Sequence, residues 1–149
     1  MFMFVVTGGA GFIGGFVSRL LLDRGFEVHI LDNLNRGRRD RFLSELLERS
    51  GCTFFQRDLS APDALSALAR DYTHILHFAA VLGVQNVLRA PYRTLRDNIL
   101  LLERMLTFAA EQTRLERFLF PSTSEVYAGS LEHMDMPVPT PETTPLALP

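Results

Sequence analysis

The chain has 149 residues, 47% of them hydrophobic, so it is long enough to form one globular domain with a substantial core. A net charge of −2 and a pI near 6.1 argue against binding to nucleic acid or to an anionic membrane surface. A single cysteine, Cys52, excludes an internal disulfide, and no apolar run approaches the roughly 18 residues of a membrane span, which favours a soluble, cytoplasmic protein.

The first fourteen residues read as an apolar strand, a glycine-rich turn and the start of a helix. The run from Phe2 to Val6 is continuously apolar, as expected for a strand buried on both faces. Glycines follow at positions 8, 9, 11 and 14 and satisfy the dinucleotide patterns G-x-G-x-x-G and G-x-x-G-x-x-G. Free N–H groups in the first helical turn, together with the helix dipole, would then bind a pyrophosphate.

Helical spacing of apolar residues continues from Phe12 to Leu21, and Gly25 is a suitable stop for that helix. A second apolar run, 26–31, ends at Asp32, which lies 18 positions after Gly14. An acidic side chain at this place can accept hydrogen bonds from the adenosine ribose hydroxyls. The alternative is an ordinary strand–loop–helix in which the glycines serve packing alone. We prefer a dinucleotide site, because the strand, the turn, the helix and the acidic residue occur together.

Strand and helix signals keep alternating along the rest of the chain, with no internal repeat. After a polar segment at 33–40 we expect a helix at 42–47, a strand at 53–56, a capped helix after Pro62, a strand at 75–78, a long helix after Pro91 and a strand at 118–120. Such alternation predicts an α/β fold of the Rossmann type, a doubly wound parallel sheet with helices on both faces. The expected strand order is 3-2-1-4-5, with a cofactor crevice at the carboxyl ends of strands 1 and 4.

The long helix and the tail after it carry two further expectations. We expect the apolar face of the helix to comprise Leu95, Ile99, Leu102, Met105, Leu106 and Ala109. Five of the eight prolines fall in the last 13 residues, which leaves no room for a helix or an internal strand. We therefore divide the chain into a partial dinucleotide-binding domain, 1–130, and an extended proline-rich loop, 131–149.

Together these motifs resemble the extended short-chain dehydrogenases, the NAD-dependent epimerase/dehydratase family that acts on nucleotide sugars. The matching segments occur in the family's order and cover essentially the whole chain: 7–14 (Thr-Gly-Gly-Ala-Gly-Phe-Ile-Gly), 32–34 (Asp-Asn-Leu), 58–59 (Asp-Leu), 77–80 (His-Phe-Ala-Ala), Asn98 and 122–127 (Ser-Thr-Ser-Glu-Val-Tyr).

The resemblance implies roles for individual residues and no metal ligands. The cofactor-binding set that it implies is Gly8, Gly11, Phe12, Ile13 and Gly14 at the pyrophosphate, Asp32 and Asn33 at the ribose, Asp58 and Leu59 beside the adenine, and Phe78, Ala79 and Ala80 toward the nicotinamide ribose, with Asn98 as an anchor near the active site. Thr123 takes the place of the residue that hydrogen-bonds the reacting sugar hydroxyl. Glu125, with Ser124 as a further candidate, lies where relatives often place acid/base groups.

Several of these residues have a second interpretation. Asp58 is equally suited to cap the helix expected after it, and Glu125 to be an exposed loop carboxylate. Asn98 is unfavourable in the middle of a helix, and we prefer the anchor to a solvated position. His77 ends a buried strand and is interpreted as a hydrogen-bonded core histidine, not a base.

The arginines at 36, 38, 39 and 41 could indicate NADP, because a 2′-phosphate needs a nearby cation. Asp32 favours NAD, since its carboxylate would accept from two ribose hydroxyls and repel a phosphate. We expect the arginines to begin the second helix as a solvated face. The expected cofactor is therefore NAD.

The family's Tyr-x-x-x-Lys pair is absent from this sequence. Four residues after Tyr72, Tyr92 and Tyr127 stand leucine, arginine and leucine, and all 15 basic residues are arginine. We therefore expect the amino-terminal half of a longer nucleotide-sugar epimerase, dehydratase or decarboxylase, inactive by itself and incomplete at the carboxyl-terminal edge of its sheet. An unpaired edge would make a homodimer possible. The alternative is a non-catalytic dinucleotide-binding module that senses redox state or tethers partners.

Overall fold

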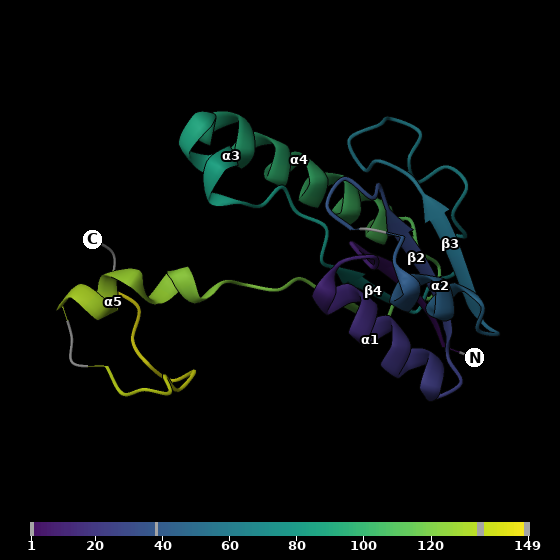
Figure 1. The fold of residues 1–149 in the computed structure, drawn as a ribbon, viewed down its shortest axis with the longest axis horizontal. Helices are drawn as coiled ribbons and strands as arrows, with labels where there is room; N and C mark the ends of the chain where they lie inside the picture. The colour runs from purple at the N-terminus through teal and green to yellow at the C-terminus, as the bar shows by residue number, and fades with distance from the viewer. Residues whose placement is uncertain (1, 38, 134–135, 148–149) are drawn as a thin grey trace.

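A computed structural model describes residues 2–37, 39–133 and 136–147 of the protein. Strands and helices follow one another along the chain (Figure 1), mostly in the expected alternation. In chain order they are β1 (Met3–Thr7), α1 (Phe12–Asp23), β2 (Glu27–Asp32), α2 (Arg41–Leu47), β3 (Cys52–Gln56), β4 (His74–His77), α3 (Val84–Arg89), α4 (Pro91–Ala110), β5 (Arg117–Leu119), the 3-10 helix η1 (Ser124–Tyr127) and α5 (Ala128–His133). Between β3 and β4 the described residues form no helix, and α3 is followed directly by α4.

The strands form one parallel sheet in the order β3-β2-β1-β4-β5, which confirms the predicted order 3-2-1-4-5. Thr7, the last residue of β1, lies level with Leu31 on β2 and with His77 on β4. The loops that follow these three strands therefore leave the sheet at the same edge. This register brings the glycine turn, Asp32 and Phe78 together.

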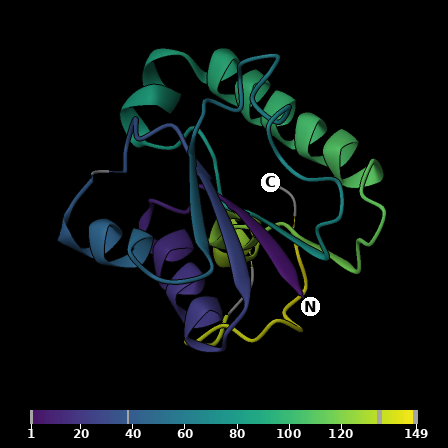
Figure 2. The ribbon, with the colours of Figure 1, turned by 90° about the vertical axis from the view of Figure 1, so that its right-hand side faces the viewer.

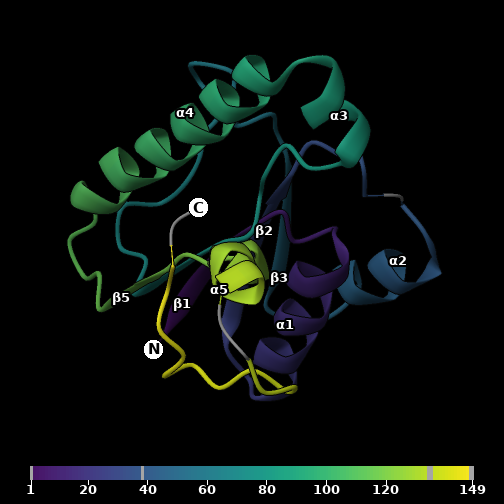
Figure 3. The ribbon, with the colours of Figure 1, turned by 90° about the vertical axis from the view of Figure 1, so that its left-hand side faces the viewer.

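Helices cover both faces of the sheet, as predicted (Figures 2 and 3). Successive residues of β1 point to opposite faces, so Val6 packs in a cluster with residues of α1 and α2, while Val5 packs with residues of α4. The core on the α1 and α2 face comprises Phe4, Val6, Leu22, Val28, Ile30, Leu43, Leu46 and Leu76. The core on the α4 face comprises Val5, Leu31, Leu59, Leu68, Tyr72, Ile75, Leu101, Met105, Phe108 and Ala109.

The prediction for the buried face of α4 was only partly right. Met105 and Ala109 are buried as expected, but Leu95, Ile99 and Leu106 are 62%, 56% and 49% exposed. The residues of α4 that are buried are Thr94, Leu101, Met105, Phe108 and Ala109. The helix carries apolar residues on two sides, and the sequence pattern alone did not identify the side that packs on the sheet.

Two helix expectations differ from the structure. The segment after Pro62 is a series of turns, in which Ala64, Ser66 and Leu68 each donate a backbone hydrogen bond to the residue three positions earlier. These turns bury Leu68 under α4 without a regular helix. Conversely α3 was not predicted, and it buries none of its side chains, so it gives no amphipathic signal.

Residues beyond β5 lead away from the sheet, and α5 lies apart from it (Figure 1). Helix α5 reaches His133, three residues into the segment expected to be an extended loop. Buried Ser130 joins α5 to the tail, because its Oγ donates to the Pro145 carbonyl at 2.7 Å and accepts from the Ala147 N–H at 2.9 Å. Among the described residues, no helix has both the length and the apolar character to cross a membrane. The cytoplasmic location stays a prediction.

Candidate functional site

The glycine turn between β1 and α1 is packed so closely that side chains would not fit. Gly8 has a φ of +69°, and a Cβ there would lie 2.7 Å from the backbone nitrogen of Ala79. A Cβ on Gly14 would overlap the Gly8 carbonyl oxygen and lie 2.8 Å from the Cα of Gly9. The turn is closed by a hydrogen bond from the Gly11 N–H to the Gly8 carbonyl at 3.0 Å. The first turn of α1 is therefore held directly above the end of β1.

The amino terminus of α1 has no cap of its own. Gly11 occupies the N-cap position and offers no side chain, and the first turn contains no acidic residue. At α2, by contrast, the Asp40 carboxylate accepts from the Leu43 N–H at 2.9 Å. The start of α1 is exposed, with Phe12 and Ile13 83% and 59% accessible. The positive end of a twelve-residue helix dipole therefore lies at the surface without a side-chain cap, and N–H groups of a first helical turn have no partner within their helix, which suits an anionic ligand such as a diphosphate.

Asp32 joins the glycine turn to the end of β2. Its Oδ2 accepts from the Ala10 N–H at 3.0 Å and its Oδ1 from the Leu34 N–H at 2.8 Å. The carboxylate is half-buried beside the uncapped helix. Leu34 has a φ of +60°, a strained conformation for a leucine, so the chain turns sharply at this point. The arrangement fixes one carboxylate next to the anion site, where it can accept from the hydroxyls of a neighbouring sugar.

The loop after β4 is tied to both β1 and α4. The Ala79 N–H donates to Thr7 Oγ1 at 3.3 Å, and the same hydroxyl lies 2.7 Å from Nδ1 of His77. Asn98 of α4 accepts from the Val81 N–H at 2.7 Å and donates to the Val81 carbonyl at 3.0 Å. Asn98 therefore holds the loop after β4 against α4, and its role beside a cofactor stays a prediction. Phe78 and Ala79 are half-buried and Ala80 is exposed at the same sheet edge.

His77 is a core residue, as predicted. It is 2% exposed, and burial lowers its pKa to about 4, so it is neutral at physiological pH. Its ring also stacks on Phe120, with centroids 5.8 Å apart. His77 therefore supports the ends of three strands and does not present a base to solvent.

Asp58 follows β3 and lies near the end of β2. Its Oδ1 accepts from the Ser60 N–H at 2.8 Å and its Oδ2 from Nδ2 of Asn33 at 3.1 Å. Hydrogen bonds from Ser60, with smaller contributions from Asn33 and the charge of Arg104, hold the pKa of Asp58 below its usual value. Because turns replace the helix expected here, Asp58 does not cap a helix. Leu59 is buried, which leaves Asp58 as the exposed member of the pair.

The arginine-rich segment before α2 differs from the prediction. Only Arg41 lies in the helix, where it pairs with Glu45 at 2.6 Å, while Arg36 and Arg39 lie in the loop before it. Arg38 is outside the described residues. A Cβ on Gly37 would lie 2.9 Å from the Cβ of Ala10, so this loop packs against the glycine turn.

Thr123, Ser124 and Glu125 are not brought to the glycine turn. All three are exposed, and they lie on the segment that leads away from the sheet (Figure 1). Thr123 caps η1, because its Oγ1 accepts from the Glu125 N–H at 3.3 Å. Their catalytic roles stay predictions.

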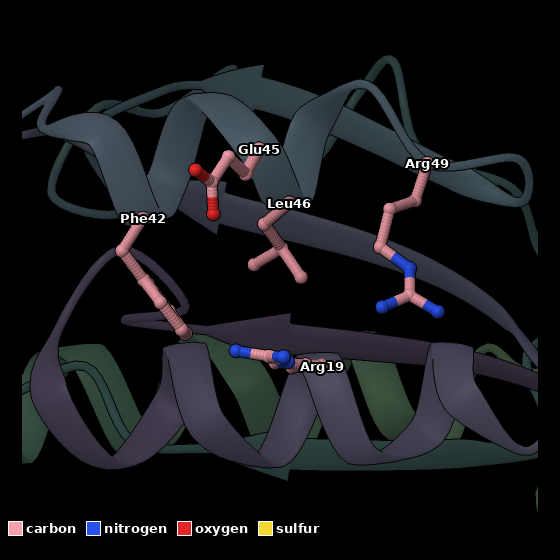
Figure 4. A pocket seen from close by; sticks show the side chains of 5 residues that line it. All are labelled: Arg19, Phe42, Glu45, Leu46 and Arg49. Atoms are coloured by element: carbon pink, nitrogen blue, oxygen red, sulfur yellow. The ribbon is translucent and has the colours of Figure 1, made fainter.

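A small hollow lies between α1 and α2, lined by Arg19, Phe42, Glu45, Leu46 and Arg49 (Figure 4). Arg49 pairs with Asp23 at 2.6 Å, and the Arg19 guanidinium lies 6.0 Å from the centroid of the Phe42 ring. The charged groups already have partners in α1, in α2 or across to the turn after α2. The hollow is a gap in helix packing, distinct from the sheet edge where the glycine turn, Asp32 and Phe78 meet.

Two residues that hold the loops at this sheet edge were missed from the sequence. Thr7 directly follows the apolar run of β1, and a hydroxyl at the last buried position of that strand is the signal that could have identified it. Arg104 is half-buried, and its Nη1 donates to the carbonyls of Leu59 and Ala61 at 2.6 and 2.7 Å. For Arg104, the signal that could have identified it is a positive charge within the helix, close to the buried residues Leu101 and Met105.

Comparison with known proteins agrees with this geometry. The sequence model described as the NAD dependent epimerase/dehydratase family matches residues 4–148. A UDP-glucose 4-epimerase from Erwinia amylovora is 36% identical over 149 aligned residues, which cover 95% of this chain and 41% of the relative.

Solved structures give the same result. The UDP-Glc/GlcNAc 4-epimerase of Campylobacter jejuni superposes with a TM-score of 0.82 at 27% identity, covering 99% of this chain and 43% of that one. A Thermus thermophilus UDP-glucose 4-epimerase in complex with NAD superposes with a TM-score of 0.75 at 31% identity, covering 97% and 44%. The chain thus spans less than half the length of these proteins.

Proposed function

The chain belongs to the NAD-dependent epimerase/dehydratase family, and on that premise we propose that it is the NAD-binding portion of an enzyme that oxidises a hydroxyl of a nucleotide sugar. The observation that carries the proposal is the uncapped start of α1, held against β1 by Gly8 and Gly14, with Asp32 bonded to the same turn. When bound, NAD supplies the acceptor for a hydride from a sugar carbon.

Each part of the crevice would hold one part of the cofactor. The N–H groups at Phe12 and Ile13 would bind the pyrophosphate, and Asp32 would accept from the adenosine ribose. Asn33 and Asp58, which are hydrogen-bonded to each other, would contact the adenine ring. The loop after β4, with Ala79 and Ala80, would border the nicotinamide ribose.

Catalysis requires more than these residues. Thr123 would hydrogen-bond the reacting sugar hydroxyl, and Glu125 would serve as an acid or base for the step after oxidation. The family's proton-transferring Tyr-x-x-x-Lys pair does not occur in this sequence. We propose that the chain binds NAD and does not turn over a nucleotide sugar by itself.

The second candidate is a dinucleotide-binding module without catalysis. The exposed position of Thr123 and Glu125, away from the glycine turn, favours it. The family match over nearly the whole chain favours the enzyme, because a pure binding module has no use for the segment 122–127.

Calorimetric titration of the chain with NAD and NADP tests the cofactor. We expect NAD to bind and NADP to bind at least about tenfold more weakly, because Asp32 repels a 2′-phosphate. Absence of NAD binding at millimolar concentration, or a preference for NADP, would refute the cofactor assignment. Epimerisation of UDP-glucose by the chain alone would refute its catalytic incompleteness.

We also propose that the whole protein pairs with a second copy through the outer stripe of α4, defined as Tyr92, Leu95, Ile99 and Leu106. These side chains are 76%, 62%, 56% and 49% exposed. They repeat at the heptad spacing of a helix seam. An antiparallel partner would bring Arg96 near Glu103 of the other copy, which makes the face self-complementary.

Sedimentation of the Ile99→Glu variant tests the pairing. A charge in the centre of the outer stripe should convert a dimer to a monomer, whereas Thr107→Glu, which adds the same charge elsewhere on α4, should not. Dimers that persist in Ile99→Glu would exclude this face as the interface.

A further inference from the structure

Arg104 reaches from α4 to the turn after β3, across the face of the sheet. Its Nη1 donates to the Leu59 carbonyl at 2.6 Å and to the Ala61 carbonyl at 2.7 Å. Both are charge-assisted bonds at short distance, and Arg104 is half-buried. No acidic side chain of the described residues forms an ion pair with Arg104 within 4 Å. Its role in the fold is therefore to hold this turn.

The same turn carries Asp58 on its exposed side. The Ala61 N–H donates to the Asp58 carbonyl at 2.9 Å and closes the turn. The Asp58 carboxylate is fixed from the other side by Ser60 and by Asn33 at the end of β2. Three attachments thus hold the turn: its own closing bond, the contact with β2 and the contact of Arg104 from α4.

Arg104 also acts on Asp58 through its charge. It is one of the groups that lower the pKa of that carboxyl, after the hydrogen bonds from Ser60 and Asn33. A carboxylate that is ionised and fixed in place accepts a hydrogen bond from an amino group and rejects a carbonyl in the same position. Adenine offers an amino group on its six-membered ring, and hypoxanthine offers a carbonyl there.

We propose that Arg104 is a positioning residue for the adenine end of the cofactor site, which selects an amino-bearing base by holding the Asp58–Ala61 turn against the end of β2. The proposal rests on the proposed function, since it assumes that the crevice binds NAD. Arg104 itself does not touch the ligand. It acts through the carbonyls of Leu59 and Ala61.

The test compares NAD with nicotinamide hypoxanthine dinucleotide by calorimetry, for the wild-type chain and for Arg104→Met, Arg104→Lys and Arg114→Met. Arg104→Met keeps the apolar stem and removes the donors and the charge. Arg104→Lys restores a charged donor. Arg114→Met removes an equal charge from the exposed loop between α4 and β5. Hydrogen exchange of the amides at 58–61 is followed in the same four proteins.

We expect the wild-type chain to prefer NAD by about tenfold, and Arg104→Met to lose most of that preference through weaker NAD binding. Arg104→Lys should recover part of it, and Arg114→Met should match the wild type. The amides at 58–61 should exchange faster in Arg104→Met alone. These results together would support the proposal.

Two results would overturn the role of Arg104 and leave the proposed function intact. If Arg104→Met exchanges faster at 58–61 but keeps the full preference for NAD, Arg104 has only a structural role. If Arg104→Met lowers the affinity for NAD and for nicotinamide hypoxanthine dinucleotide equally, Arg104 does not select the base. Failure of the wild-type chain to bind either ligand would refute the proposed function itself, and the inference with it, so the two kinds of failure are distinguishable.

Discussion

Replacing Gly8 by alanine tests whether the glycine turn needs its close packing. Alanine at a φ of +69° costs about 1–2 kcal/mol of folding free energy. Its Cβ would also lie 2.7 Å from the Ala79 nitrogen and 2.9 Å from the Phe78 carbonyl carbon, and such overpacking costs about 1–3 kcal/mol. We therefore expect urea unfolding to give a free energy of unfolding lower by about 2–5 kcal/mol.

Gly25→Ala is the matched control for the Gly8 variant. Gly25 has a φ of +77°, but a Cβ there would meet no atom within 4 Å, so only the backbone strain applies. The Gly8 variant should lose more stability than this control and should also bind NAD more weakly, because Ala79 must move. Equal losses in the two variants, with unchanged NAD affinity, would refute the close approach of the turn to the loop after β4.

Three further predictions concern single side chains. Asp32→Asn should weaken NAD binding and reduce the difference in affinity between NAD and NADP measured by calorimetry, because the amide no longer repels a 2′-phosphate. An unchanged ratio of the two affinities would contradict the role of the carboxylate. Asp40→Ala should lower the free energy of unfolding by about 1 kcal/mol through loss of the α2 cap, with NAD affinity intact; weaker NAD binding would show that α2 takes part in the site. The unfolded chain protonates His77 near pH 6.5 and the folded chain only near pH 4, so acidification across that window should destabilise the protein by up to about 3 kcal/mol. In urea titrations at several pH values, His77→Phe should reduce this dependence, and an unaltered slope would exclude His77 as its source.

Local sequence features predicted most of the site's framework. The apolar run of β1, the glycine spacing and the acid at position 32 each report on their own segment, and the structure joins them at one sheet edge. The turns at 58–69 were predicted less well, because spacing at 65 and 68 suits a helix and a compact turn equally. Whether this segment forms a helix or turns depends on its contact with α4, because Arg104 of α4 donates to two carbonyls of the segment.

The sequence by itself determined the five strands and their order in a parallel sheet, and the phosphate-binding turn, because these follow from periodicity and from glycine at fixed offsets. Only the tertiary structure decided which side of α4 packs on the sheet, which residues hold the loops at the strand ends and where Thr123 and Glu125 lie. These properties arise from contacts between residues far apart in the chain, such as Thr7 with His77 and Arg104 with Leu59. A pattern within one segment contains no information about its partner across the sheet.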